Sequence, residues 1–322
     1  MPRYRNALPQ LSGKLFLTDG GLETTLVFHD GLDLPHFAAF DLMKDEAGRS
    51  RLSDYFRRYV AIARERRTGF IFESPTWRAS RDWAEKLGYA PVELDRMNRA
   101  SIALMAVLRD ASETPHSPMV LSGQIGPRGD GYVPGAAMSA AEADAYHAEQ
   151  IGSFAGTEAD MVTAITMNYV EEAIGIARAA KAAGMPAAIS FTTETDGRLP
   201  TGQPLNEAIE QVDAETDAAP AYYMINCAHP SHFAHVLVSD EPWTQRIRGL
   251  RANASKCSHA ELDAATALDA GDPLELGREY RDILKRLPQV NVLGGCCGTD
   301  HRHVEAIARS CAIDPYRAAQ AA

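Results

Sequence analysis

The sequence predicts a single α/β domain, a (β/α)8 TIM barrel that takes up residues 1–322. Eight short apolar runs, each bounded by glycine, proline or polar residues, alternate with segments in which apolar residues recur at helical spacing. The runs are continuously apolar, which is typical of parallel strands that are covered on both faces. Eight strand–helix units in roughly 300 residues fit a closed barrel.

The predicted strands follow one another along the whole chain, at 15–19, 70–74, 119–126, 160–166, 187–193, 222–227, 247–254 and 290–297. Apolar residues at helical spacing lie between them, for example at 53–67, 92–111, 139–156, 170–184 and 273–287. The segment 126–143 is rich in glycine and proline, and it predicts a long loop over one end of the barrel.

An open, doubly wound sheet is the competing fold for this alternation. The first predicted strand is followed by DGGLETT, which lacks the spaced glycines of a dinucleotide-binding turn. No P-loop pattern occurs elsewhere in the chain. The barrel is therefore the prediction.

The composition is that of an average globular protein, and it narrows the choice of partners. Hydrophobic residues make up 45% of the chain and charged residues 23%, which is enough apolar material for a large core. The net charge of −11 and the scattered basic residues argue against nucleic acid and mildly favour cationic small molecules. No secretion signal and no apolar run of about 18 residues occurs, so we expect a cytoplasmic protein without a membrane span.

Polar or reactive side chains end every predicted strand. The carboxyl ends of parallel strands meet at one rim of a barrel, and barrel enzymes carry their sites on that rim. We therefore expect residues that are far apart in sequence to meet there. The strand-end residues are Asp19, Glu73, Ser74, Gln124, Thr166, Thr192, Thr193, Glu194, Asn226, Cys227, Asn253, Cys296 and Cys297.

Three of the five cysteines end the sixth and eighth predicted strands, namely Cys227 and the adjacent pair Cys296 and Cys297. Three thiolates leave the fourth position of a tetrahedral Zn²⁺ open, which is typical of a metal that binds substrate. Ordinary buried cysteines are the alternative, and we expect this role for Cys257 and Cys311. A disulfide within the adjacent pair is a second alternative, but it would leave Cys227 without a role.

A histidine cluster after Cys227 offers a different metal site. His229, His232 and His235 are spaced to share one face of a helix. Such a cluster would suit a metal-dependent hydrolase, but barrels of that kind usually have a His-x-His pair at the end of the first strand, where this chain has Asp19. Solvated or capping histidines are the other explanation.

Zinc held by three thiolates has a defined chemistry. A substrate thiol in the open position stays deprotonated well below the pKa of about 8.5 of a free thiol. The sulfur remains electron-rich and suits attack on an alkyl group, while the net negative charge of the site favours a cationic donor such as a sulfonium or a quaternary ammonium.

Five motifs of the chain resemble those of the homocysteine S-methyltransferase family, which includes betaine-homocysteine methyltransferases and the homocysteine-binding barrel of cobalamin-dependent methionine synthase. The motifs are DGGLET, SGQIGPRGDGY, SFTTETDGRLPTGQPLNEAI, INCAHP and GGCCGT, in the family's order over most of the chain. The resemblance implies a (β/α)8 barrel in which Cys227, Cys296 and Cys297 are the zinc ligands.

The resemblance also implies substrate contacts. Asp19, with the backbone of Gly20 and Gly21, matches the loop that holds the amino acid end of homocysteine in the family. Asn226 and Asn253 match motif asparagines, and we expect them to orient backbone or substrate. Local turn hydrogen bonding is the alternative for both asparagines.

The implied activity is that of a zinc-dependent S-methyltransferase. It would move a methyl group from a cationic donor, S-methylmethionine, S-adenosylmethionine or betaine, to homocysteine or a related thiol, as in methionine biosynthesis. Its partners would be these small molecules, without nucleic acid or membrane, and a homo-oligomer is compatible with the sequence. A non-catalytic barrel that binds zinc or a thiol stays open as an alternative, as does a hydrolase that uses the histidine cluster.

Two positions depart from the family pattern. Ile165 stands where many relatives have a glutamate that contacts the substrate ammonium, and losing a buried carboxylate leaves that ammonium short of a partner. Either the acceptor is not homocysteine, or another carboxylate takes over the contact; the candidates are Glu171, Glu172 and Glu194. Arg251 stands where relatives often have an aromatic residue, and it predicts either a carboxylate contact or an ordinary salt bridge.

Three aromatic residues, Trp77, Trp83 and Tyr89, follow the second predicted strand. Aromatic faces attract cations, so these side chains are candidates for stabilising a cationic methyl donor near the metal. Packing beneath a loop is the alternative for each of them.

Overall fold

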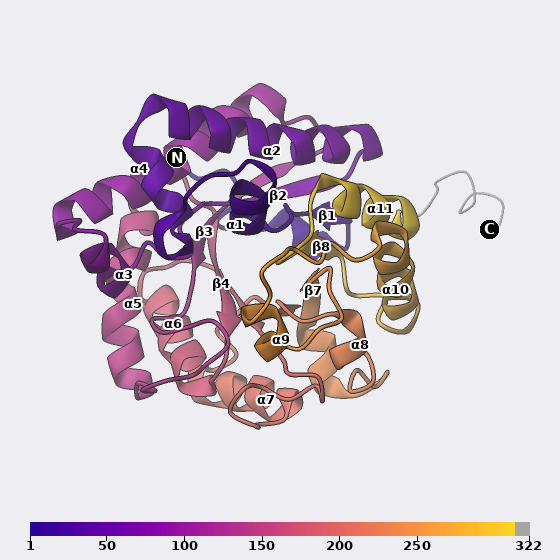
Figure 1. Cartoon of the computed structure of the whole chain (residues 1–322). Helices are drawn as coiled ribbons and strands as arrows, with labels where there is room; N and C mark the ends of the chain where they lie inside the picture. The colour runs from indigo at the N-terminus through magenta and orange to yellow at the C-terminus, as the bar shows by residue number, and fades with distance from the viewer. Residues whose placement is uncertain (313–322) are drawn as a thin grey trace.

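The computed structural model describes residues 1–312, and it contains a closed barrel of eight parallel strands surrounded by helices (Figure 1). Each strand pairs with the next, and β8 pairs with β1 to close the barrel. The strands are β1 (Phe16–Leu17), β2 (Gly69–Glu73), β3 (Met119–Ile125), β4 (Met161–Met167), β5 (Ala187–Phe191), β6 (Tyr222–Asn226), β7 (Ile247–Ala252) and β8 (Val292–Gly295). The predicted (β/α)8 barrel is confirmed, and residues 313–322 of the predicted domain lie outside the described residues.

Long helices pack around the barrel, and the five predicted helical segments are all helical. The helices are α1 (Leu22–Thr24), α2 (Glu46–Arg66), α3 (Arg81–Lys86), α4 (Pro91–Ser112), α5 (Ala140–Ala155), α6 (Val170–Ala182), α7 (Leu205–Thr216), α8 (Pro230–Phe233), α9 (His259–Asp263), α10 (Pro273–Arg286) and α11 (His301–Cys311). Helix α2 begins earlier than predicted because the Asp45 side chain caps it by accepting a hydrogen bond from the Gly48 amide at 2.8 Å. Over the described part of the chain, no helix is both long enough and apolar enough to span a membrane.

Short helical turns lie before β1, between α1 and α2, and between α8 and β7. They are η1 (Pro9–Ser12), η2 (Thr25–His29), η3 (Pro35–Phe37), η4 (Ala39–Lys44) and η5 (Pro242–Arg246). The predicted loop at 126–143 is irregular up to Ser139, whose hydroxyl accepts a hydrogen bond from the Glu142 amide and begins α5.

The interior of the barrel changes from apolar to polar along the strand direction. Toward the amino-terminal ends of the strands the interior is one apolar cluster, which consists of Leu8, Phe16, Ile71, Val120, Met161, Ala188, Tyr222, Met224 and Val292. Side chains alternate along a strand, so the residues two positions further on face the same interior. There Ser122 bonds to Thr163 at 2.8 Å and Ser190 bonds to Asn226 at 2.6 Å. This polar layer lies just before the carboxyl ends of the strands, so the part of the interior next to the rim is polar.

The Tyr280 side chain of α10 ties the ends of β7 and β8 together. Its hydroxyl accepts a hydrogen bond from the Ala252 amide at 2.7 Å and donates one to the Gly294 carbonyl at 2.8 Å. All of these atoms belong to buried residues, so water does not replace the contact.

We predict that Tyr280→Phe lowers the free energy of unfolding by about 1–3 kcal/mol, because it leaves the buried Ala252 amide without a partner. Urea denaturation measures this change. Tyr222→Phe is the matched control: Tyr222 is equally buried, but its hydroxyl has only long contacts, to Gln10 at 3.5 Å and to the Met161 sulfur at 3.9 Å. Equal losses in the two variants would contradict the assignment.

Candidate functional site

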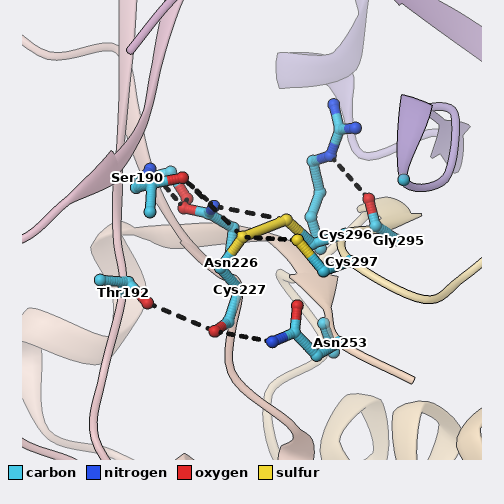
Figure 2. The surroundings of a disulfide bond; sticks show 12 residues. Ser190, Thr192, Asn226, Cys227, Asn253, Gly295, Cys296 and Cys297 are labelled. Carbon is cyan, nitrogen blue, oxygen red and sulfur yellow. Dashed lines mark hydrogen bonds between the residues drawn. A yellow bond between two sulfur atoms is a disulfide. The ribbon is translucent and has the colours of Figure 1, made fainter. Parts of the chain in front are cut away.

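The three cysteines predicted to meet do meet at the carboxyl-terminal rim (Figure 2). Cys227 follows β6, and Cys296 and Cys297 follow β8. Their sulfur atoms all lie within 4.8 Å of one another. Within residues 1–312 this is the one group of three or more His, Cys, Asp or Glu side chains with the spacing of metal ligands.

Two of these cysteines form a disulfide, between Cys227 and Cys296. The alternative of a disulfide within the adjacent pair is therefore wrong, and Cys297 is free with its sulfur 4.0 Å from that of Cys227. The barrel explains the pairing, because β6 and β8 both flank β7 and bring the Cα atoms of Cys227 and Cys296 to 5.4 Å.

The same arrangement fits a zinc ion once the disulfide is reduced. Zinc–sulfur bonds of about 2.3 Å in a tetrahedral site place neighbouring sulfur atoms roughly 3.8 Å apart. The separation of 4.0 Å between Cys227 and Cys297 matches this spacing. Cys227, Cys296 and Cys297 are thus able to hold one metal together, and the ligand role itself stays a prediction.

Hydrogen bonds to its carbonyl hold Cys227 in an unusual backbone conformation. Its φ of 52° lies in the left-handed region, which costs a non-glycine residue roughly 1–2 kcal/mol. The Cys227 carbonyl accepts hydrogen bonds from Asn253 Nδ2 at 3.0 Å and Thr192 Oγ1 at 3.4 Å (Figure 2). It also accepts one from His259 Nε2 at 2.7 Å. These bonds offset the strain and fix the direction of the thiol.

Asn226 supports the end of β4 in the same way. Its Oδ1 accepts hydrogen bonds from the Thr166 amide at 2.8 Å and from Ser190 Oγ at 2.6 Å, and its Nδ2 donates to Thr166 Oγ1 at 2.9 Å. Thr166 has a φ of 63°, so the asparagine holds a second strained residue. Asn226 and Asn253 both orient backbone, as one of the two predicted roles required, and their contact with substrate stays a prediction.

Paired glycines let the first and last strands approach each other beside the cysteines. The Gly21 amide donates to the Thr299 carbonyl at 3.0 Å, and the Gly295 amide donates to the Asp19 carbonyl at 2.9 Å. A Cβ atom on Gly21 would lie 2.6 Å from the Cys296 carbonyl oxygen, so no larger residue fits without moving the cysteine loop.

A small cavity opens beside the cysteines and gathers several of the predicted site residues. Asp19, Gly20, Gly21, Cys296 and Cys297 were predicted for the site, and all of them line this cavity. Its full lining is Asp19, Gly20, Gly21, Leu22, Glu23, Thr24, Gln124, Ile165, Arg251, Cys296 and Cys297. The predicted substrate loop and two of the predicted ligands thus share one wall, whereas Asn226 and Asn253 lie outside it.

Arg251 forms a buried ion pair in this cavity. Its Nη2 donates to Asp19 Oδ1 at 2.8 Å, and its Nε donates to the Gly295 carbonyl at 3.1 Å. The second carboxylate oxygen of Asp19 accepts a hydrogen bond from the Tyr55 hydroxyl at 3.0 Å. Of the two roles predicted for Arg251, the structure contains a salt bridge, which uses the Oδ1 atom of Asp19.

Two further carboxylates surround this ion pair. Burial raises the pKa of Glu73 to about 7 and that of Glu23 to about 7, while the charge of Arg251 lowers both. The sequence placed Glu73 at a strand end, but it gave Glu23 no role. The only available signal for Glu23 was its position in DGGLETT, one residue after a helix begins at the rim.

None of the three glutamates expected to replace the carboxylate missing at Ile165 lines the cavity. Glu172 is buried against His147, 2.9 Å away, and accepts a hydrogen bond from the Arg128 amide. Glu194 bonds to His259 at 3.0 Å, and Glu171 is exposed on α6. Ile165 itself forms an apolar part of the cavity wall.

The loop before α5 covers the cysteines with Tyr132, a residue that the sequence did not single out. The Tyr132 hydroxyl lies 3.5 Å from Cys297 Sγ, and its ring stacks on His259 with 3.9 Å between ring centroids. Burial raises the pKa of the Cys297 thiol, while the hydrogen bond from Tyr132 lowers it. The predicted covering loop therefore reaches the reactive sulfur directly.

The histidine cluster is engaged in other contacts. His229 Nε2 lies 3.2 Å from Glu279, His232 Nε2 bonds to the Lys256 carbonyl at 2.9 Å, and His235 Nε2 bonds to the Asp196 carbonyl at 3.2 Å. Burial lowers the pKa of His229 to about 4, so its ring is neutral at pH 7. These contacts favour the capping and hydrogen-bonding explanation and give the hydrolase alternative no support.

The predicted aromatic cluster binds a cation of the protein itself. The Arg78 guanidinium lies 3.9 Å from the centre of the Trp77 ring and 3.7 Å from that of Trp83. Tyr89 packs on Phe40 and donates a hydrogen bond to Asp41. These contacts match the packing alternative for the three aromatic residues.

Comparisons with known proteins agree with this geometry. The family model of homocysteine S-methyltransferase matches residues 16–311. The chain is similar to the homocysteine methyltransferase MmuM from Escherichia coli, whose oxidised form gives a TM-score of 0.72 at 18% identity over 95% of this chain and 99% of that one. The metallated form of MmuM gives 0.70 at 18% identity over 94% and 98%. At this identity the structural likeness shows the fold, and no curated protein sequence matches the chain.

The raised pKa of Glu73 predicts a pH-dependent stability. Between pH 4.5 and about 7 the folded protein holds a proton that the unfolded chain has lost, so the free energy of unfolding falls as the pH rises through this window, by up to about 3 kcal/mol. Glu73→Gln removes this contribution. We expect the variant to gain stability relative to the parent at pH 8 but not at pH 4.5.

Urea denaturation of both proteins at the two pH values measures the effect. The exposed Glu171→Gln is the matched control, with the same difference from the parent at both pH values. A Glu73→Gln difference that does not change with pH would rule out the raised pKa.

Proposed function

Because the chain belongs to the homocysteine S-methyltransferase family, we propose that it transfers a methyl group from a cationic small-molecule donor to the thiol of homocysteine or a close analogue. The observation that carries the proposal is the meeting of Cys227, Cys296 and Cys297 beside a small cavity with charged residues in its lining. Thiol ligands and a small-molecule site next to each other are what thiol activation requires.

Zinc is the metal that this donor set favours. Cys227, Cys296 and Cys297 would hold it after reduction of the disulfide, since three thiolates at this spacing suit Zn²⁺. When bound, Zn²⁺ supplies the positive charge that keeps an acceptor thiol deprotonated at neutral pH.

The residues of the chain position the acceptor. Gly20 and Gly21 bring backbone to the cavity wall that Cys296 and Cys297 share, so an acceptor held there has its sulfur beside the cysteines. Tyr132 lies beside the Cys297 sulfur and would limit the access of water to it. A dry environment favours the thiolate as a nucleophile, because water no longer solvates its charge.

The transfer is a single displacement. The acceptor thiol gives its proton to solvent, and its sulfur attacks the methyl carbon to form a new carbon–sulfur bond. The bond from that carbon to the donor's sulfonium sulfur or ammonium nitrogen breaks, and its electron pair stays on the donor atom, which becomes neutral. The product is a thioether, which is methionine when homocysteine is the acceptor. S-methylmethionine and S-adenosylmethionine are the donors to test first, followed by betaine.

We predict that serine at any one of the positions Cys227, Cys296 or Cys297 removes zinc and lowers methyl transfer by more than about 100-fold, because changing even the groups that support a metal ligand costs about 10- to 100-fold. The protein is reduced and loaded with zinc, its metal content is measured by mass spectrometry, and product formation is followed with each donor. Cys257→Ser is the control, because Cys257 lies outside the cysteine group, and it retains zinc and activity.

A serine variant at the cysteine group that keeps full zinc and full activity would overturn the proposal. Zinc binding by the parent protein without transfer from any donor would instead favour the non-catalytic barrel.

A further inference from the structure

Two carboxylates but only one guanidinium line the cavity beside the cysteines. Asp19 and Arg251 neutralise each other at 2.8 Å, and Tyr55 occupies the second oxygen of the Asp19 carboxylate. Glu23 is the other carboxylate that lines the cavity, and Ile165 adds an apolar wall. Among the lining residues, the Glu23 carboxylate is therefore left without an ion-pair partner.

Glu23 has no cationic partner within the described chain. No lysine, arginine or histidine nitrogen of residues 1–312 lies within ion-pair distance of its carboxylate. Arg78, whose charge acts on Glu23, is held by the Trp77 and Trp83 rings and donates to the Gly129 carbonyl at 2.7 Å. A half-buried carboxylate beside a cavity and without a partner is a binding point for a cationic ligand group.

Arg251 provides an independent sign of a ligand. It is 3% exposed and lines the cavity, yet its Nη1 is buried without a hydrogen-bond partner among the residues that the structure describes. An unpaired buried guanidinium nitrogen is costly, and an anionic ligand group would satisfy it. The lining of the cavity thus includes a carboxylate without an ion-pair partner and an arginine with one unpaired nitrogen.

We propose that Glu23 binds the ammonium group of the acceptor, and that this one residue distinguishes homocysteine from thiols that lack an amine. The inference rests on the proposed function and names the substrate class of the same site. Glu23 is a specificity-determining residue in this scheme, and Arg251 positions the carboxylate end of the acceptor.

Two acceptors that differ in one group test the proposal. Homocysteine and 4-mercaptobutyrate share the thiol, the chain length and the carboxylate, and only homocysteine has the amine. With reduced, zinc-loaded protein we expect kcat/KM for homocysteine to exceed that for 4-mercaptobutyrate by about 10- to 100-fold, the range of one charge-assisted contact.

The variant Glu23→Gln keeps the shape of the side chain and removes its charge. We expect kcat/KM for homocysteine to fall by about 10- to 100-fold, mainly through KM, and that for 4-mercaptobutyrate to change by less than about 3-fold. Adding Ile165→Glu to this variant returns a carboxylate to the cavity wall, and the preference for the amine should return with it. Glu171→Gln, exposed on α6, is the matched control and leaves both values unchanged.

A second readout needs neither metal nor turnover. Calorimetric titration of the reduced, zinc-free protein with methionine and with 4-(methylthio)butyrate, the two thioether products, should show tighter binding of methionine, and Glu23→Gln should remove the difference. Loss of binding to both thioethers in equal measure would mean a structural role for Glu23 and would overturn the inference.

The outcomes separate the two proposals. Methyl transfer to both thiols at equal rates, or an equal effect of Glu23→Gln on both, would refute the role of Glu23 while leaving the transfer reaction established. Selective binding of methionine through Glu23 without methyl transfer from any donor would support the role of Glu23 and refute the proposed activity.

Discussion

The buried ion pair between Arg251 and Asp19 holds the reactive rim together. Arg251 is the penultimate residue of β7 and Asp19 follows β1, so their contact crosses β8, which lies between those strands in the barrel. Arg251 also bonds to the Gly295 carbonyl at 3.1 Å, immediately before the cysteine pair. A buried ion pair contributes little net stability after desolvation, but removing one partner leaves an uncompensated charge. The value of this pair lies in fixing where the cysteine loop leaves the barrel.

Two residues at strand ends on the same rim have strained backbone conformations, and these also help to position the cysteines. Thr166 and Cys227 both have positive φ angles, and the side chains of Asn226 and Asn253 satisfy the backbone groups that these conformations expose. The turn at Cys227 redirects its thiol from the strand direction toward β8. Without the two asparagines the strands would still form, since periodicity and burial determine them, but the three sulfur atoms would lose their common orientation.

The predictable parts of this protein are those that follow from periodicity and topology. Apolar runs predict all eight strands, and the rule that parallel strands end on one rim predicts that Cys227 and Cys296 lie close together. Contacts that depend on the direction of a side chain could not be predicted from periodicity or topology. Trp77 and Trp83 have the chemistry of a cation site, but neighbouring Arg78 occupies it. Tyr132 lies in an irregular loop, where no periodicity indicates which residue points inward.

Charge balance explains why an apolar residue at position 165 is compatible with a polar cavity. Asp19, Glu23 and Glu73 already lie near a single guanidinium, that of Arg251, which forms its ion pair with Asp19. The charge of Arg251 lowers the pKa of each of the three carboxyl groups against the larger effect of burial. A further carboxylate at position 165, the residue type that the family resemblance implies there, would add repulsion without adding a cation, and one of the carboxyl groups would stay protonated. Ile165 avoids this crowding. The Glu23 side chain, on α1, lines the same cavity as Ile165, Cys296 and Cys297.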